Sequence, residues 1–136
     1  MRDVAYIALG SNLGDRAQHL ARAREAIARL PATRIVAASA VDETDPLGGL
    51  DQPAYLNQIV AVETTLSPRD LLDRLHAIEA SEGRVRRDRW SARTLDLDIV
   101  CFDVQTANEP GLEVPHPGLS SRHFWQRELA EVREAR

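Results

Sequence analysis

The chain has 136 residues, a length that fits one domain and is too short for two that fold independently. Hydrophobic residues make up 43% and charged residues 28%, which is typical of a globular chain and excludes a disordered one. A net charge of −4 argues against a general nucleic-acid coat protein. No apolar run is long enough for a membrane span or a secretory leader, so we expect a cytoplasmic protein.

Two residue types narrow the chemistry. All 17 basic residues are arginine, and without a lysine amine the chain can form neither a Schiff base nor a Walker-type phosphate loop. Any phosphate would have to be bound by arginine forks, backbone amides or a metal. Cys101 is the single cysteine, which excludes an internal disulfide and a cysteine-based zinc site.

The first half of the chain predicts a strand, a helix and two more strands. Residues 4–9 form a short apolar run without a helical stripe, which indicates a buried strand. An apolar stripe at helical spacing predicts a helix over residues 13–30, and residues 35–41 predict a second strand. Residues 42–53 have the composition of a loop. Residues 55–63 alternate in polarity, as a strand with two different faces does.

The second half predicts a helix, a strand and a final helix. Ser67 followed by Pro68 is typical of a helix start, and the apolar stripe continues to about residue 81. Residues 94–102 are the last clear strand, and the final helix starts near residue 120. This order predicts an α+β fold of the ferredoxin-like, split βαβ kind, with two helices on one face of an antiparallel four-stranded sheet.

Paired aspartates are the strongest local signal. The period of two places Asp96 and Asp98 on one face of the strand and apolar residues on the other. Two carboxylates about 7 Å apart suit Mg²⁺, which completes its shell with water and phosphate oxygens. The solvated outer face of an edge strand would show the same pattern, so both interpretations stay open here.

A polar loop upstream of the aspartates contains five arginines: Arg84, Arg86, Arg87, Arg89 and Arg93. Guanidinium groups pair with phosphate oxygens, and a loop can close over a bound triphosphate. A solvated loop neutralised by nearby acids is one alternative, and a nucleic-acid patch with Trp90 as a stacking platform is another. Beside the paired aspartates, the loop favours metal-assisted phosphoryl transfer.

Aromatic and amide side chains suggest where a flat ligand can bind. Tyr55 and Asn57 share a strand face, so a heterocycle can stack on the ring while the amide supplies a donor and an acceptor. Phe124 can supply a second ring, although core packing explains a lone aromatic equally well. His116 lies between two prolines and suits either a structural hydrogen bond or proton donation to phosphate.

Several segments together resemble one known family. Arg-Thr-Leu-Asp-Leu-Asp-Ile at residues 93–99, with Trp90 upstream, is the most specific of them. The other matching segments are residues 8–15, 43–48, 51–57, 79–84, 114–117 and 122–124. The sequence resembles the 6-hydroxymethyl-7,8-dihydropterin pyrophosphokinases of folate biosynthesis.

The resemblance implies transfer of pyrophosphate from MgATP to the hydroxymethyl group of 6-hydroxymethyl-7,8-dihydropterin, with release of AMP. Asp96 and Asp98 match the positions that hold two Mg²⁺ ions, and together with Arg84 and Arg93 they form the implied catalytic group. The positions that match the ATP side are His76, Glu79, Arg84, Trp90, Arg93, Ile99, His116 and Arg122. Those that match the pterin side are Thr44, Leu47, Tyr55, Asn57 and Phe124.

We expect a single domain over residues 1–136 with a C-terminal tail shorter than is usual in the family. The implied partners are the two small-molecule substrates, with no nucleic acid, no membrane and a monomeric chain. Charged residues follow Phe124 where the family has an apolar segment, so a diverged relative that binds ATP or pterin without turnover remains the main alternative. An arginine-loop nucleic-acid-binding module is the second alternative.

Overall fold

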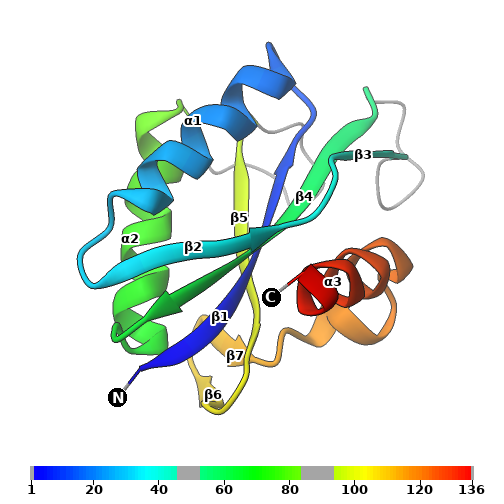
Figure 1. Ribbon diagram of the computed structural model, residues 1–136. Helices are drawn as coiled ribbons and strands as arrows, with labels where there is room; N and C mark the ends of the chain where they lie inside the picture. Colours follow the sequence, from blue (N-terminus) through cyan, green and yellow to red (C-terminus); the bar gives the residue numbers. More distant parts are fainter. Residues whose placement is uncertain (1, 46–52, 84–93, 136) are drawn as a thin grey trace.

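The computed structural model describes residues 2–45, 53–83 and 94–135 (Figure 1). None of the helices in these ranges is long and apolar enough to cross a membrane. The elements follow in the order β1 (Asp3–Ser11), α1 (Arg16–Ala28), β2 (Thr33–Ala38), β3 (Asp42–Thr44), β4 (Tyr55–Thr64), α2 (Pro68–Ser81), β5 (Asp96–Phe102), β6 (Ala107–Glu109), β7 (Leu112–Val114), a 3₁₀ turn (Pro117–Ser120) and α3 (His123–Ala135).

The main sheet is antiparallel, with strands in the order β2-β4-β1-β5. β4 lies between β1 and β2, and β1 lies between β4 and β5, so two split βαβ units interleave. This confirms the ferredoxin-like arrangement expected from the sequence. The four strands of this core sheet were predicted; β3 adds a fifth strand beside β4, so the prediction of a loop was wrong for Asp42–Thr44.

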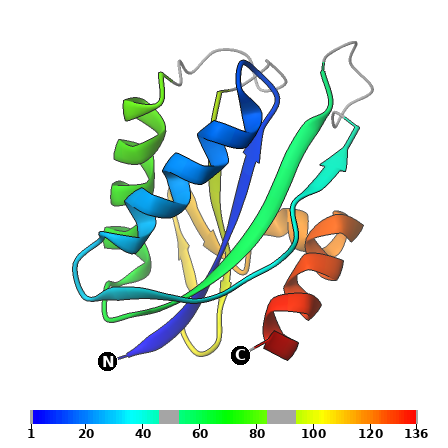
Figure 2. The same ribbon diagram turned by 45° about the horizontal axis from the view of Figure 1, so that its top comes forward.

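Helices cover both faces of the sheet. α1 and α2 lie on one face and α3 lies on the other, as Figures 1 and 2 show. The alternation along β1 explains this: Ala5, Ile7 and Leu9 enter the core beneath α1 and α2, whereas Tyr6 and Ala8 enter the core beneath α3. Each face therefore has its own apolar core.

Side-chain caps fix the starts of α1 and α2. The Ser67 hydroxyl accepts a hydrogen bond from the Asp70 backbone N–H at 3.1 Å, so α2 begins where the sequence predicted. The Asp15 carboxylate accepts one from the Gln18 N–H, and α1 therefore begins after the predicted residue 13.

α3 is amphipathic despite its charged composition. Trp125, Leu129 and Val132 are buried along one stripe and pack against the sheet. The charged residues that follow Phe124 therefore leave an apolar stripe intact. The helix begins at His123, three residues later than predicted, because the 3₁₀ turn comes first.

Candidate active site

A pocket of about 470 Å³ opens near the junction of β1, β3, β4 and β5, and α2, the 3₁₀ turn and α3 also contribute to its walls. Every predicted site residue that the structure describes lines this pocket: Thr44, Tyr55, Asn57, His76, Glu79, Asp96, Asp98, Ile99, His116, Arg122 and Phe124. The other predicted site residues, Leu47, Arg84, Trp90 and Arg93, lie outside the described residues. Chain segments more than 60 residues apart in sequence thus meet at one cavity.

The floor of the pocket is made of small residues on the central strand β1. In the strand register, Gly10 stands between Asn57 on β4 and Asp96 on β5, and Ala8 pairs with Asp98. A Cβ added at Gly10 would lie 3.3 Å from the Asn57 Oδ1 atom and 3.5 Å from Tyr55 Cδ1. The absence of a side chain at this position leaves room for the Asn57 and Tyr55 side chains of β4.

Asp96 and Asp98 are half-buried and line the pocket, while Leu97 and Ile99 are buried in the core beneath α1 and α2, although they also contribute to the pocket lining. The alternation predicted for this strand is therefore confirmed. Carboxylate oxygens are the donors that a hard divalent cation prefers, so this pair is suited to hold one or more such ions. Within the described residues no group of three or more His, Cys, Asp or Glu side chains forms a complete metal cage. A bound ion would complete its shell with water or ligand oxygens.

His116 stands next to the acidic pair in a fixed orientation. The Gly118 backbone N–H donates to His116 Nδ1 at 2.9 Å, so the neutral ring carries its proton on Nε2. That Nε2 atom lies 3.7 Å from Asp98 Oδ1. Burial lowers the pKa of His116, and the positive charge of Arg122 lowers it further against the opposing effect of Asp96. The ring is thus held as a neutral donor that faces the carboxylates.

Trp125 supports both His116 and Arg122. Its ring meets the His116 ring edge-on at a centroid distance of 4.9 Å, and the Arg122 guanidinium lies 4.3 Å from its centroid. The residue itself is almost fully buried. Trp125 was not predicted from the sequence, although its place beside Phe124 on an amphipathic helix was an available signal.

A second group of side chains gathers at the β3–β4 end of the pocket. The Asn57 amide donates a hydrogen bond to the Thr44 hydroxyl, which fixes the orientation of the amide. Tyr55 comes from the same face of β4, and Phe124 comes from the first turn of α3. The pocket therefore combines two aromatic rings with an oriented amide, as a flat polar heterocycle requires.

Glu79 has a structural contact as well as a place in the pocket wall. It is almost fully buried on α2 and accepts a hydrogen bond from the Leu97 backbone N–H at 2.7 Å. β5 is an edge strand, and this contact satisfies a backbone donor on its outer side. Glu79 thereby holds the strand that presents the two aspartates.

The match to a known family extends over most of the chain. The family model described as 7,8-dihydro-6-hydroxymethylpterin-pyrophosphokinase (HPPK) matches residues 6–134. The chain belongs to the HPPK family. It is 48% identical over 127 residues to the 2-amino-4-hydroxy-6-hydroxymethyldihydropteridine pyrophosphokinase of Pseudomonas aeruginosa, a match that covers 93% of this chain and 78% of the relative. It is 42% identical over 132 residues to the Bacillus subtilis protein of the same name, with 97% and 79% covered.

Solved structures share the HPPK fold. An HPPK-DHPS chain in complex with substrates superposes with a TM-score of 0.72 at 12% identity, covering 97% of this chain and 40% of that chain. Plasmodium falciparum HPPK-DHPS with SDX-DHP gives a TM-score of 0.63 at 14% identity, covering 90% of this chain and 38% of that chain. At these identities the likeness is one of fold, and this chain spans about two fifths of those longer chains.

Proposed function

We propose that this HPPK-family chain transfers pyrophosphate from MgATP to the hydroxymethyl group of 6-hydroxymethyl-7,8-dihydropterin and releases AMP, a step of folate biosynthesis. The observation that carries the proposal is that one pocket contains an acidic pair, two aromatic rings and an oriented amide. The family match and the names of the relatives support the same activity.

In the proposed pterin subsite, Tyr55 and Phe124 stack on the two faces of the ring and Asn57 pairs with its amide edge. The hydrogen bond between Asn57 and Thr44 supports this assignment, because it fixes which amide atoms face the ligand. Leu47, from the segment outside the described residues, would add a backbone contact.

The proposed nucleotide subsite uses His116 and Arg122 for phosphate oxygens, and His76, Glu79 and Ile99 for the part of ATP that lies toward α2. Support comes from the common pocket wall and from the orientation of His116 Nε2 toward the acidic pair. Arg84, Trp90 and Arg93, from the other segment outside the described residues, would complete the phosphate contacts and cover the substrates.

Asp96 and Asp98 are the proposed ligands of two Mg²⁺ ions, and their carboxylate oxygens fit that metal. Bound there, Mg²⁺ would offset the negative charge of the phosphate oxygens. Glu79 supports the pair indirectly, because it anchors the backbone of the strand between them.

The protein contributes mainly by positioning. The stacked rings and the amide orient the hydroxymethyl oxygen toward the β-phosphorus of ATP, and the arginines stabilise the charge on the phosphate oxygens. A bond forms between that oxygen and the β-phosphorus as the bond from the β-phosphorus to the AMP oxygen breaks, and the alcohol proton passes to solvent. We assign no side chain as general base.

Cytoplasmic location, a monomeric state and the absence of nucleic-acid binding stay predictions from the sequence.

The test is a product assay with purified protein, MgATP and the reduced hydroxymethylpterin. We expect release of AMP, without ADP, only when the pterin is present. Asp96→Asn and Asp98→Asn should each lower turnover about a hundredfold or more, because each removes a charge needed in the transition state. Thermal unfolding should show that both variants fold. Asp73→Asn, an exposed acid on α2, is the matched control and should retain full activity.

Four results would contradict the proposal or one of its assignments. Release of AMP without pterin would show that the protein hydrolyses ATP instead of transferring pyrophosphate to the pterin. No AMP from a folded protein that binds either ligand would favour the diverged relative without turnover. Near-normal activity in Asp96→Asn or Asp98→Asn would show that the substituted aspartate is not a required Mg²⁺ ligand. Binding of RNA or DNA that falls steeply with salt would instead favour the nucleic-acid module.

A further inference from the structure

β3 is a short strand that carries one wall of the proposed pterin subsite. It has only three residues, and its last residue, Thr44, accepts the hydrogen bond from Asn57. Asp42, its first residue, stands directly opposite Asn57 in the register with β4. Three strand residues provide little pairing energy of their own, so other contacts must fix the position of β3.

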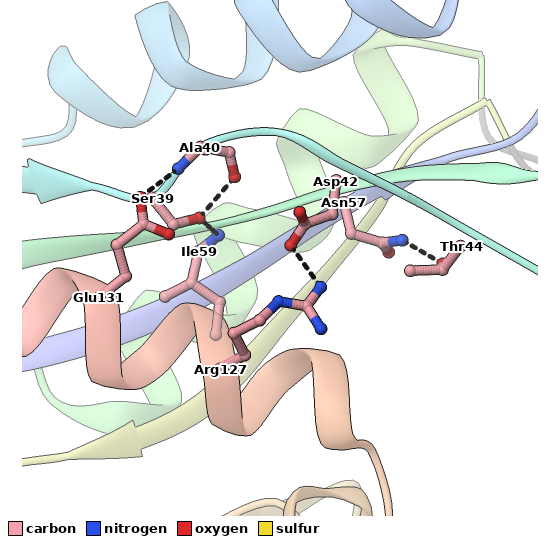
Figure 3. A network of polar contacts seen from close by, with 8 residues as sticks. All are labelled: Ser39, Ala40, Asp42, Thr44, Asn57, Ile59, Arg127 and Glu131. Atoms are coloured by element: carbon pink, nitrogen blue, oxygen red, sulfur yellow. Dashed lines mark hydrogen bonds and ion pairs between the residues drawn. The ribbon is translucent and has the colours of Figure 1, made fainter.

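Side chains of α3 provide these contacts (Figure 3). The Arg127 guanidinium donates to the Asp42 carboxylate at 2.8 Å, and the Glu131 carboxylate accepts from the Ala40 backbone N–H at 2.9 Å. Ser39 ties the same segment to β4, because its hydroxyl accepts from the Ile59 N–H at 3.0 Å. The chain that leads into β3 is thus held between β4 and α3.

Glu128 lies on α3 beside this contact and is fully buried. The charged groups that face it are Asp42 on β3 and Arg127 and Glu131 on α3. Burial raises the pKa of Glu128 to about 9, and the neighbouring Asp42 carboxylate contributes in the same direction. Neither of its carboxyl oxygens meets a hydrogen-bond donor within the described residues, whereas the Asp42 carboxylate can accept a hydrogen bond from a protonated Glu128. At neutral pH the cluster therefore holds one buried proton and one Asp42–Arg127 ion pair.

We propose that Asp42, Arg127 and Glu128 form a positioning clamp, through which α3 sets the width and orientation of the pterin subsite. This inference rests on the proposed function. Phe124 lies one turn before Arg127 on α3, whereas Thr44 lies two residues after Asp42 on β3. The α3–β3 clamp therefore joins the helix that carries one stacking ring, Phe124, to the strand whose Thr44 orients the Asn57 amide. None of its three residues lines the pocket, so they act through Thr44, Asn57 and Phe124.

The clamp has a consequence for pH dependence. When Glu128 loses its proton, a buried carboxylate faces the Asp42 carboxylate, and their repulsion lets α3 and β3 separate more easily. We expect the KM for the pterin to rise near pH 9, while the KM for ATP changes less. Glu128→Gln keeps the size of the side chain and cannot ionise, so its pterin KM should lack this component of the pH dependence.

Steady-state kinetics on the full chain, with each substrate varied in turn, test the clamp. Arg127→Gln should raise the KM for the pterin about three- to fivefold with the KM for ATP unchanged, and Arg127→Lys should recover part of the loss. Arg34→Gln is the matched control, because it breaks an exposed ion pair to Glu63 between β2 and β4, away from the pocket. An equal rise in both KM values, or an unchanged pterin KM, would overturn the proposal.

A second readout does not depend on activity. In NMR spectra of the substrate-free protein, the Thr44 backbone amide and the Asn57 side-chain amide should titrate near pH 9 in the wild type and not in Glu128→Gln. Identical titrations in the two proteins would overturn the clamp even if the enzyme is active. A wild-type protein without pterin-dependent AMP would refute the proposed function, while the two titrations would still decide whether the clamp exists.

Discussion

At the scale of single residues, the floor of the pocket depends on Gly10, because no side chain projects into the pocket from this position. Gly10→Ala would place a methyl group 3.3 Å from Asn57 Oδ1, within the row that joins Asn57, Gly10 and Asp96. We expect the KM for the pterin to rise about three- to tenfold, because a shift of a few tenths of an ångström misaligns the amide. The free energy of unfolding should stay equal or rise slightly, since alanine loses less backbone entropy than glycine in a strand.

Kinetics with each substrate varied, together with denaturant unfolding, check this prediction. A pterin KM equal to that of the wild type would mean that the wall at Asn57 adjusts freely. A loss of stability would mean that the methyl group disturbs the strand pairing instead of the site.

The residues that sequence patterns placed correctly are those on strands. The faces of Asp96, Asp98, Tyr55 and Asn57 follow from the period of two, which holds wherever the strand itself is correctly assigned. Glu128 could not be placed in this way. Glutamate is rarely fully buried; its burial, together with Asp42, which lies 86 residues earlier in the chain, explains how it remains protonated there.

At the scale of elements, the 3₁₀ turn before α3 sets the other side of the pocket. Gly118 donates its N–H to His116 Nδ1, and a Cβ at this position would lie 2.9 Å from Arg122 Nε and 3.1 Å from His116 Nδ1. Gly118→Ala should therefore displace Arg122 from the Trp125 ring. Because the Arg122 side chain is flexible, we expect a change in unfolding free energy below about 1 kcal/mol.

The effect of Gly118→Ala should appear in the KM for ATP, which we expect to rise about fivefold or more, as on loss of a charge-assisted hydrogen bond. The KM for the pterin should change less. Gly10→Ala is the comparison variant, because it acts beside Asn57 in the proposed pterin subsite. If both variants raised the same KM, the division of the pocket into a pterin subsite and a nucleotide subsite would be contradicted.

β3 shows why one element escaped prediction. Asp42 and Glu43 are poor strand formers, and the segment that follows is rich in glycine and proline, so local composition indicates a loop. The strand forms because β3 pairs with the first residues of β4, Tyr55 to Asn57, and because Arg127 on α3 binds the Asp42 carboxylate. Contacts across the sheet overrode the local preference, and a single sequence does not display them. α2, by contrast, was predicted well because its cap, Ser67, lies next to it in the chain.

At the scale of the whole molecule, two apolar cores on opposite faces of one sheet support the site. The core beneath α1 and α2 is continuous and largely aliphatic, whereas α3 also buries a carboxyl group, that of Glu128, on its face of the sheet. Because this buried acid can ionise, the free energy of unfolding depends on pH. The packing of α3 against the sheet therefore responds to the protonation state of Glu128.

The sign of this coupling follows from where the proton is held. In the folded state burial raises the pKa of Glu128 to about 9 from an ordinary value of 4.5, so between these values the folded protein keeps a proton that the unfolded chain has lost. Raising the pH through this window therefore favours unfolding, by up to about 1.4 kcal/mol per pH unit from this group. Below the window both states are protonated and the contribution is constant.

Glu128→Gln should remove this dependence, because the amide fills the same space and does not titrate. We expect its free energy of unfolding to exceed that of the wild type by an amount that grows between about pH 6 and 9, as measured by urea unfolding at fixed ionic strength. Glu134→Gln removes the same charge from an exposed position on α3 and should follow the wild-type profile. Parallel profiles for wild type and Glu128→Gln would show that Glu128 is ionised in the folded protein, and α3 would then have to hold a buried negative charge beside Asp42.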